Sequence, residues 1–169
     1  MSAKHVEPHE PLERKSMNLI LWRHAEAELL RAGQDDAERE LTAKGRRHAK
    51  RMAEWLDARM PASARILVSP AARAQQTAGP LGRRFKTVAA LAPGRSADDL
   101  LAAVGWPELS DTVLVIGHQP TLGIVAARLL CGADQAWPVK KGAVWWLERR
   151  EREGLVQVAL QAVQNSGKS

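Results

Sequence analysis

The chain has 169 residues, of which 45% are hydrophobic, and its 25 Lys and Arg residues outnumber its 19 Asp and Glu residues by 6. This length suits one domain with a single hydrophobic core, and the composition excludes a disordered or fibrous protein. The excess of positive charge favours an anionic partner, without choosing among nucleic acid, acidic lipid and phosphorylated molecules.

The first elements are a polar lead-in, a buried strand and a long helix. Residues 1–16 combine two prolines with mixed charge, so we expect a flexible N-terminal extension before a domain at 17–169. The uninterrupted apolar run 19–22 predicts a buried strand. Apolar residues that recur every three or four positions predict a helix over 41–60, with Thr42 as its N-cap.

The middle of the chain alternates short apolar runs with helical patterns. Gly79-Pro80 predicts a break within the first of these helices, Ser96 is an N-cap for the second, and Gly132 ends the third. The strands are predicted at 64–70, 85–91 and 111–120, and the helices at 71–85, 96–106 and 120–132.

The last third of the chain has a different pattern. Residues 142–149 and 154–163 are apolar runs separated by a charged turn, which predicts an antiparallel hairpin at the end of the sheet. Up to about residue 131, strands alternate with helices. We therefore expect an α/β fold of three layers, with a mostly parallel central sheet flanked by helices and antiparallel C-terminal strands.

Basic side chains follow three of the predicted buried strands. Arg23 and His24 end the first, His118 ends the strand at 111–120, and Arg73 lies one helical turn beyond the strand at 64–70. In open α/β sheets, ligands bind at the carboxyl edge of the strands. Because like charges repel, stability alone gives no reason to gather these groups there. The pattern predicts a cationic pocket.

Such a pocket suits phosphoryl transfer. Guanidinium groups bind phosphate oxygens with two parallel hydrogen bonds, and a histidine can act as a nucleophile that forms a covalent intermediate. The surrounding cations would stabilise the charge of the transferring group. Two histidines allow one to be neutral for attack and the other to be protonated to hold an oxygen.

Four stretches resemble, in order, the motifs of the histidine phosphatase superfamily, whose signature is an Arg-His-Gly (RHG) strand end. Between Arg73 and His118 there are too few residues for the helical insertions of phosphoglycerate mutases and larger acid phosphatases. The resemblance is to the SixA-type phosphohistidine phosphatases, and it implies the phosphoglycerate mutase-like fold without a cap insertion. The four stretches are LWRHAEA, LTAKGRRHA, LVSPAARAQQTA and LVIGHQP.

The resemblance also implies roles for individual residues. His24 would be the nucleophile and would be transiently phosphorylated, while Arg23, Arg73 and His118 would complete the phosphate pocket. Arg39, just before the Leu-Thr pair that opens the helix at 41–60, matches an arginine that reaches the same pocket. A solvated loop arginine is the alternative interpretation of Arg39.

The chain departs from the family pattern at two points. Ala25 replaces the glycine of the signature, which would cause strain if that position needs a positive φ. No glutamate follows the third strand, where phosphomutase-like members have their general acid. Glu26 is the candidate proton donor and substrate contact near the nucleophile. A missing strong acid favours phosphohistidine as the substrate, because a protonated imidazole leaves readily from phosphorus.

The sequence therefore predicts a phosphatase that acts through a phosphohistidine enzyme intermediate, most readily on phosphohistidine of a protein partner such as a phosphotransfer domain. A small-molecule phosphomonoesterase with the same pocket is the alternative within enzymes. A basic nucleic-acid-binding module is the alternative from another class, but with one Phe and no Tyr the chain lacks interleaved aromatic residues. We expect no cofactor and no metal, since His24 and His118 lack a third zinc ligand at a sensible spacing. The oligomeric state stays open.

The location in the cell follows from what the sequence lacks. No apolar run approaches the roughly 20 residues that cross a bilayer, and residues 1–16 carry no hydrophobic signal segment. We expect a cytoplasmic protein with no membrane contact. The single cysteine, Cys131, cannot form an internal disulfide, which agrees with a reducing compartment, and we expect it to be buried as a small apolar residue.

Overall fold

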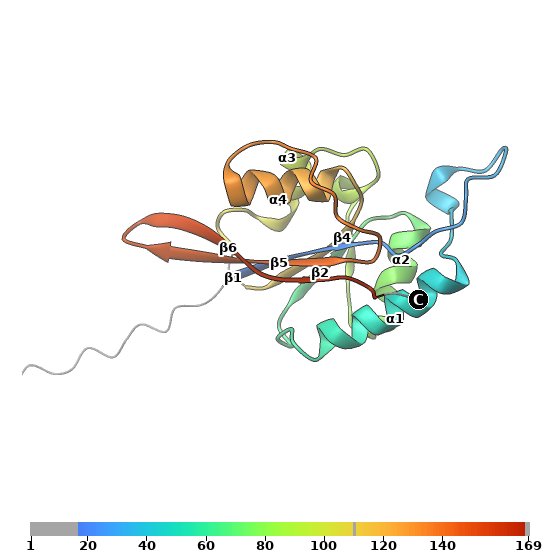
Figure 1. The fold of residues 1–169 in the computed structure, drawn as a ribbon, viewed down its shortest axis with the longest axis horizontal. Helices are drawn as coiled ribbons and strands as arrows, with labels where there is room; N and C mark the ends of the chain where they lie inside the picture. Colours follow the sequence, from blue (N-terminus) through green and yellow to red (C-terminus); the bar gives the residue numbers. More distant parts are fainter. Residues whose placement is uncertain (1–16, 110, 168–169) are drawn as a thin grey trace, which may run out of the picture.

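The computed structural model describes residues 17–109 and 111–167, so the extension expected at 1–16 lies outside the described residues. The helices and strands follow the predicted order (Figure 1). They are β1 (Met17–Arg23), α1 (Ala43–Asp57), β2 (Arg65–Val68), α2 (Ala72–Ala78), β3 (Lys86–Thr87), α3 (Ala97–Val104), β4 (Val113–Gly117), α4 (Thr121–Cys131), β5 (Val144–Arg152) and β6 (Leu155–Gln164). Three short 3₁₀ helices lie between them, η1 (Asp36–Glu38), η2 (Gly79–Leu81) and η3 (Ala89–Leu91).

The six strands form one mixed sheet in the order β3-β2-β4-β1-β5-β6. The first four are parallel to one another, β5 is antiparallel to β1, and β6 is antiparallel to β5. The predicted α/β class is thus confirmed, including the parallel centre and the antiparallel C-terminal strands. The three parallel strands β2, β4 and β1 lie side by side, so their carboxyl ends meet at one edge.

Helices cover both faces of the sheet because the buried strands are apolar on both faces. Leu19 and Leu21 of β1 belong to the core formed with α3 and α4, whereas Ile20 and Trp22 belong to the core formed with α1 and α2. Side chains of a strand alternate between faces, so one strand feeds both cores. Figure 1 shows α3 and α4 on one side of the sheet and α1 on the other.

The ends of the helices confirm the predicted caps. Thr42 accepts a hydrogen bond from the backbone N–H of Gly45 at the start of α1, and Ser96 forms a capping box with Asp99 at the start of α3. Gly132 ends α4 in the left-handed conformation, with φ of 75°. The break predicted at Gly79-Pro80 is the change from α2 to η2.

Two local expectations are wrong. The strand predicted at 85–91 is reduced to the two residues of β3, because η3 takes over at Ala89, and both residues of β3 are exposed at the sheet edge. Cys131 is exposed, since it is the last residue of α4 and lies beyond the part of the helix that packs on the sheet.

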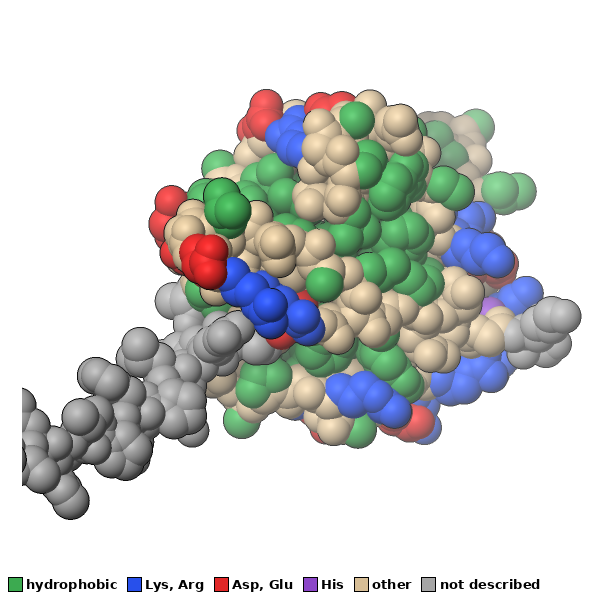
Figure 2. Space-filling model, turned by 60° about the vertical axis from the view of Figure 1, so that its left-hand side comes forward, with side chains coloured by type: hydrophobic (Ala, Val, Ile, Leu, Met, Phe, Trp, Pro, Cys, Tyr) green, Lys and Arg blue, Asp and Glu red, His purple; other side chains and the backbone are tan. Residues whose placement is uncertain are grey.

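The hairpin of β5 and β6 extends past the rest of the sheet (Figure 1). Near its base, Trp145 and Trp146 pack against the cores on opposite sides of the sheet, as the alternation of a strand requires. Figure 2 shows the face on the hairpin side, where Lys and Arg side chains are separated by acidic, polar and hydrophobic ones. The positive charge of the chain is therefore not gathered into one stripe on this face.

Candidate active site

The two histidines meet because of the register of β1 and β4. Arg23, the last residue of β1, pairs with Gly117, the last residue of β4, so His24 and His118 leave adjacent parallel strands at the same level. The backbone N–H of His24 donates to the carbonyl of Gly117 over 3.2 Å. The two imidazole rings lie 5.2 Å apart between centroids, and both are buried.

One ring nitrogen of His24 is fixed by the backbone. Nδ1 lies 2.8 Å from the carbonyl oxygen of Ala25, and because a carbonyl can only accept, Nδ1 carries the proton. Nε2 of a neutral His24 therefore holds the free lone pair. The backbone N–H of Ala25 donates to Thr77. Ala25 has no positive φ, since Glu153 is the one non-glycine residue with such a φ in the described ranges, so the departure from the signature glycine causes no backbone strain there.

His118 is held by the end of the neighbouring strand. Its Nε2 lies 2.7 Å from Oγ of Ser69, the residue that follows β2. Its Nδ1 is buried and has no hydrogen-bond partner among the described residues. A buried polar atom without a partner is uncommon in folded proteins, and here it belongs to a residue that lines a cavity.

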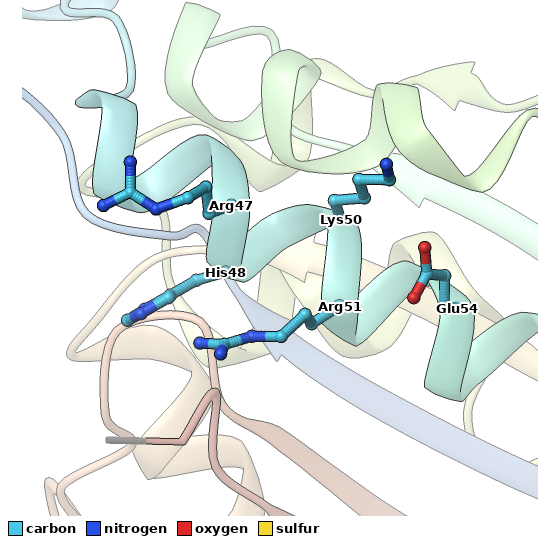
Figure 3. A pocket seen from close by; sticks show the side chains of 5 residues that line it. All are labelled: Arg47, His48, Lys50, Arg51 and Glu54. Atoms are coloured by element: carbon cyan, nitrogen blue, oxygen red, sulfur yellow. The ribbon is translucent and has the colours of Figure 1, made fainter. Parts of the chain in front are cut away.

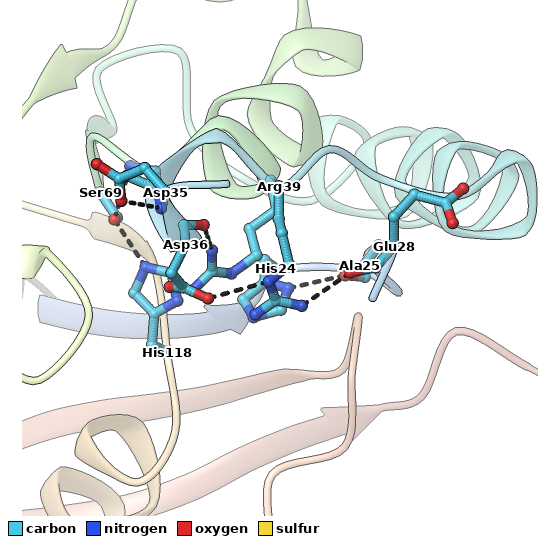
Figure 4. A network of polar contacts seen from close by, with 11 residues as sticks. His24, Ala25, Glu28, Asp35, Asp36, Arg39, Ser69 and His118 are labelled. Carbon is cyan, nitrogen blue, oxygen red and sulfur yellow. Dashed lines mark hydrogen bonds and ion pairs between the residues drawn. The ribbon is translucent and has the colours of Figure 1, made fainter. Parts of the chain in front are cut away.

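Two arginines share one carboxylate beside the histidines. Arg73 of α2 donates from Nη2 to Oδ2 of Asp36 over 2.9 Å and from Nη1 to the backbone carbonyl of Asp36 over 2.8 Å. Arg39 donates from Nε to Oδ1 of the same carboxylate over 3.0 Å. Figure 4 shows Asp36 and Arg39 beside the two histidine rings.

The two histidines and the arginines line one cavity of about 300 Å³ at the carboxyl edge of the parallel strands. The cavity brings together five of the six residues that the sequence predicts for the site, and four further residues join them. Its lining consists of Arg23, His24, Ala27, Arg39, Arg73, Pro93, His118, Gln119 and Lys141. This arrangement offers an anion several guanidinium groups and a neutral imidazole nitrogen.

Glu26, the sixth predicted residue, is turned toward α1. Its carboxylate accepts a hydrogen bond from the hydroxyl of Thr42 over 2.9 Å, and its carbonyl accepts from the backbone N–H of Thr42 over 3.0 Å. The approach is close, because a Cβ at Gly45 would lie 2.0 Å from the Glu26 carbonyl oxygen. Glu26 is not among the residues that line the cavity, and its contact with substrate stays a prediction.

Burial is the main reason why the pKa values of His24 and His118 are low. It lowers the pKa of His24 to about 4, with the hydrogen bond to Ala25 opposing the shift and nearby arginine charges adding to it. Burial also lowers the pKa of His118 to about 3, and the charges of His24 and Arg73 act in the same direction. Both rings are thus neutral at pH 7 when no anion is bound. The division into one neutral and one protonated histidine during phosphoryl transfer stays a prediction.

The depressed pKa values predict that the free protein loses stability in acid. The unfolded state takes up a proton on each histidine near pH 6.5, whereas folded His24 does so only near pH 4. Stability is therefore fully present above pH 6.5 and declines as the pH falls toward 4, by about 3 kcal/mol for His24 alone. Thermal melts between pH 7.5 and 4.5 should show this decline, and His24→Gln should make it less steep, with the part due to His118 remaining. An equal slope in both proteins would contradict the assignment.

The sequence did not point to Asp36, Ser69, Gln119 or Lys141 as parts of this site. For Asp36, the available signal was its place three residues before Arg39, a spacing that lets a carboxylate meet a guanidinium within one turn. Ser69 directly follows a predicted strand, which places it at the same edge as His118. Lys141 and Gln119 carried no comparable signal.

A second cavity, of about 530 Å³, lies on the outer surface of α1 and is lined by Arg47, His48, Lys50, Arg51 and Glu54. In Figure 3, His48 and Arg51 extend toward the C-terminal segment, whereas Arg47 lies farther from it, near the start of α1. Arg51 donates to the carbonyl of Ser166 over 2.8 Å. We call this cavity the basic hollow.

Within 17–109 and 111–167, no three His, Cys, Asp or Glu side chains are grouped so that they could hold a metal ion. None of the helices in the same ranges combines the length and apolar character needed to span a bilayer.

The model of the histidine phosphatase superfamily (branch 1) matches residues 19–94. Two uncharacterized proteins from strains of Mycobacterium tuberculosis are 34% identical over 112 residues, and the match spans 60% of this chain and only 66% of the length of each relative.

Solved structures cover more of the chain. One, provisionally described as the phosphohistidine phosphatase SixA of Nakamurella multipartitia, is 28% identical with a TM-score of 0.74, covering 89% of this chain and 96% of that one. The protein histidine phosphatase SixA in complex with tungstate is 25% identical with a TM-score of 0.71, covering 89% and 97%. A mycobacterial glucosyl-3-phosphoglycerate phosphatase, 19% identical with a TM-score of 0.65 and covering 87% and 98%, shares the fold.

Proposed function

The chain belongs to the histidine phosphatase superfamily, and from this premise we propose that it removes the phosphoryl group from phosphohistidine on a protein partner, by way of a phosphorylated His24. One observation carries the proposal. A neutral histidine with its Nδ1 proton tied to the backbone lines the same cavity as Arg23, Arg73 and His118. This is the set of groups that nucleophilic phosphoryl transfer needs.

In the first step, Nε2 of His24 forms a bond to phosphorus while the bond from phosphorus to the substrate imidazole breaks. The substrate ring, protonated on its other nitrogen beforehand, leaves as neutral imidazole. The His24 ring becomes a phosphorylated cation that keeps its Nδ1 proton on the Ala25 carbonyl. Water then attacks phosphorus, its released proton stays on the phosphate, and His24 returns to the neutral form.

The cationic side chains act on the phosphoryl oxygens during both steps. Arg23 is held through Nη1 by the carbonyl of Val139 and Arg73 through both terminal nitrogens by Asp36, and both guanidinium groups line the cavity. Their positive charge stabilises the charge of the transferring group in a site with little water. The ring of His118 lines the same cavity and closes it on the side of Ser69.

The lack of an acid in the cavity supports phosphohistidine as the substrate. The cavity lining contains no Asp or Glu. Burial alone would raise the pKa of nearby Asp36, but its bonds to Arg73 and Arg39 lower it overall, so Asp36 is ionised and cannot donate a proton at pH 7. An alkoxide leaving group needs such a donor, whereas a protonated imidazole does not.

The basic hollow supports a protein as the carrier of that phosphohistidine. Lys141 lines the cavity, and the next residue, Gly142, is so close to Ser166 that a Cβ there would lie 3.2 Å from its side chain. Ser166 in turn accepts from Arg51 of the basic hollow. Basic side chains therefore extend from Lys141 at the cavity to Arg51 on α1. An acidic protein surface around the phosphohistidine would be complementary in charge to this region.

We expect kcat/KM for a phosphohistidine-bearing protein to exceed that for a sugar phosphate by about 100-fold or more, because the sugar alkoxide leaves without an acid. Replacing both Arg47 and Lys50 by Glu should raise the KM for the phosphoprotein about tenfold, because two repulsive charges would face its acidic surface. Turnover of phosphoramidate, which is too small to reach the hollow, should not change. Phosphate release from the three substrates measures these effects.

The matched control replaces two exposed basic residues outside the basic hollow by Glu. They are Lys86 of the edge strand β3 and Arg84, two residues before it. This control should behave like the unaltered protein on all three substrates. A higher kcat/KM for the sugar phosphate would instead favour the small-molecule phosphomonoesterase, a function that the glucosyl-3-phosphoglycerate phosphatase of the same fold has by name.

A further inference from the structure

Asp36 connects helix α2 with the loop between β1 and α1 at the cavity, and Gln76 of α2 joins the same loop farther along, through Glu40 and the backbone N–H of Leu41. Arg73 belongs to α2 and its side chain is 4% exposed, whereas Arg39 lies in the long loop between β1 and α1. The carboxylate of Asp36 accepts from Arg73 on one oxygen and from Arg39 on the other, over 2.9 and 3.0 Å. Three charged groups are therefore joined at the rim of the cavity.

The atoms used by Asp36 determine which donors of Arg73 remain. Both terminal nitrogens of Arg73 donate to Asp36, one to the carboxylate and one to the backbone carbonyl, so Asp36 holds the far end of the guanidinium. Nε of Arg73 is fully buried, so the second N–H of each terminal nitrogen is what Arg73 can offer to an anion in the cavity that it lines. A guanidinium carries five N–H donors in a rigid plane, so fixing the far end also fixes the direction of the remaining donors.

Asp36 also fixes Arg39. The 3₁₀ helix η1, which precedes Arg39, has no buried residue that would anchor the loop. The side chain of Arg39 donates to the carboxylate of Asp36 and to the carbonyl of Glu28. Without the carboxylate, Arg39 and Arg73 would repel each other and one of the two ties on Arg39 would be lost. A negative charge between them allows both cations to stay beside the buried histidines.

We propose that Asp36 is a positioning residue for phosphoryl transfer, which orients Arg73 and Arg39 so that their free donors face the phosphoryl oxygens. The inference rests on the proposed function, because it takes the cavity as the phosphoryl site. It assigns Asp36 no contact with the reacting atoms. The alternative, in which Asp36 competes with the phosphoryl group for the arginines, predicts the opposite change in anion affinity.

The test is the affinity for inorganic orthophosphate, measured by calorimetry, together with kcat and KM for phosphoramidate. Asp36→Ala should weaken orthophosphate binding about tenfold and lower kcat/KM about 30-fold, since misdirected donors weaken both ground-state and transition-state contacts. Asp36→Asn, which retains an acceptor oxygen but no charge, should lie between Asp36→Ala and the unaltered protein. It also serves if the alanine variant fails to fold.

The matched control is Glu38→Ala, which removes an exposed carboxylate from the same 3₁₀ helix and should leave both measurements unchanged. In the Arg39→Ala protein, the additional change Asp36→Ala should weaken orthophosphate binding by about threefold or less, compared with about tenfold in the unaltered protein. The effect is smaller because one of the two cations that Asp36 orients is already absent. Additive effects, or tighter orthophosphate binding by Asp36→Ala or Asp36→Asn, would overturn the inference. If the unaltered protein binds no orthophosphate, the proposed function fails instead.

Discussion

His24→Ala is expected to lower kcat on a phosphohistidine substrate by about 10⁴-fold or more, the size of effect that removing a nucleophile produces. His24 provides a neutral ring nitrogen whose proton is held on the opposite side by a carbonyl, and no second nucleophile in the cavity has that arrangement among the described residues. Incubation with labelled substrate should leave acid-labile, base-stable phosphate on the unaltered protein and none on the variant.

His48→Ala is the control for this experiment. His48 is also a buried histidine, but it lies on α1 and lines the basic hollow, so its removal should preserve the phosphorylated intermediate. The melting temperature of His24→Ala at pH 7 should remain close to that of the unaltered protein, which separates loss of chemistry from loss of fold. Near-full activity of a folded His24→Ala protein would show that another group attacks phosphorus.

The second large effect concerns Arg73→Ala, for which we expect a loss of about 10³-fold in kcat/KM. The variant removes a buried cation from the cavity and leaves the carboxylate of Asp36 without it, so that in the proposed reaction Asp36 would repel the phosphoryl oxygens. Arg73→Lys should recover little of this loss, because an ammonium group cannot hold both acceptors of Asp36 and still present a fixed edge to the anion. Steady-state kinetics and orthophosphate affinity measure the change.

Arg83 offers a control of similar chemistry. It pairs with Asp57 over 2.7 Å and donates to backbone carbonyls at the end of α1, without lining the cavity. Arg83→Ala should therefore affect thermal stability and leave kcat/KM unchanged. An Arg73→Ala protein that keeps more than a tenth of the kcat/KM would exclude a central role of Arg73 in charge stabilisation.

The convergence of Arg23, His24, Arg73 and His118 could be predicted from the sequence for a simple physical reason. Parallel strands of one sheet end at the same edge, so a residue just past a buried strand is placed there even when the order of the strands is unknown. The apolar runs identified the strands, and the exact register of β1 and β4 then brought the histidines level.

The sequence could not predict features that depend on loops, because a loop has no periodic pattern of apolar residues. Asp36 and Glu26 lie in the loop after β1, where no repeat tells which side chain turns inward, and the structure turns Glu26 toward Thr42 and Asp36 toward the arginines. The neutral state of His118 follows from its burial and from the neighbouring charges, which a strand pattern does not contain. The end of β3 was misjudged because an apolar run does not separate a strand from a 3₁₀ turn.

The contact at Gly45 has a consequence for how this protein could be altered. A methyl group there would overlap the backbone of Glu26, two residues after His24, so a residue of α1 limits how far that backbone can move. Laboratory selection for altered turnover therefore has a route through the position of α1 that leaves every side chain lining the cavity unchanged.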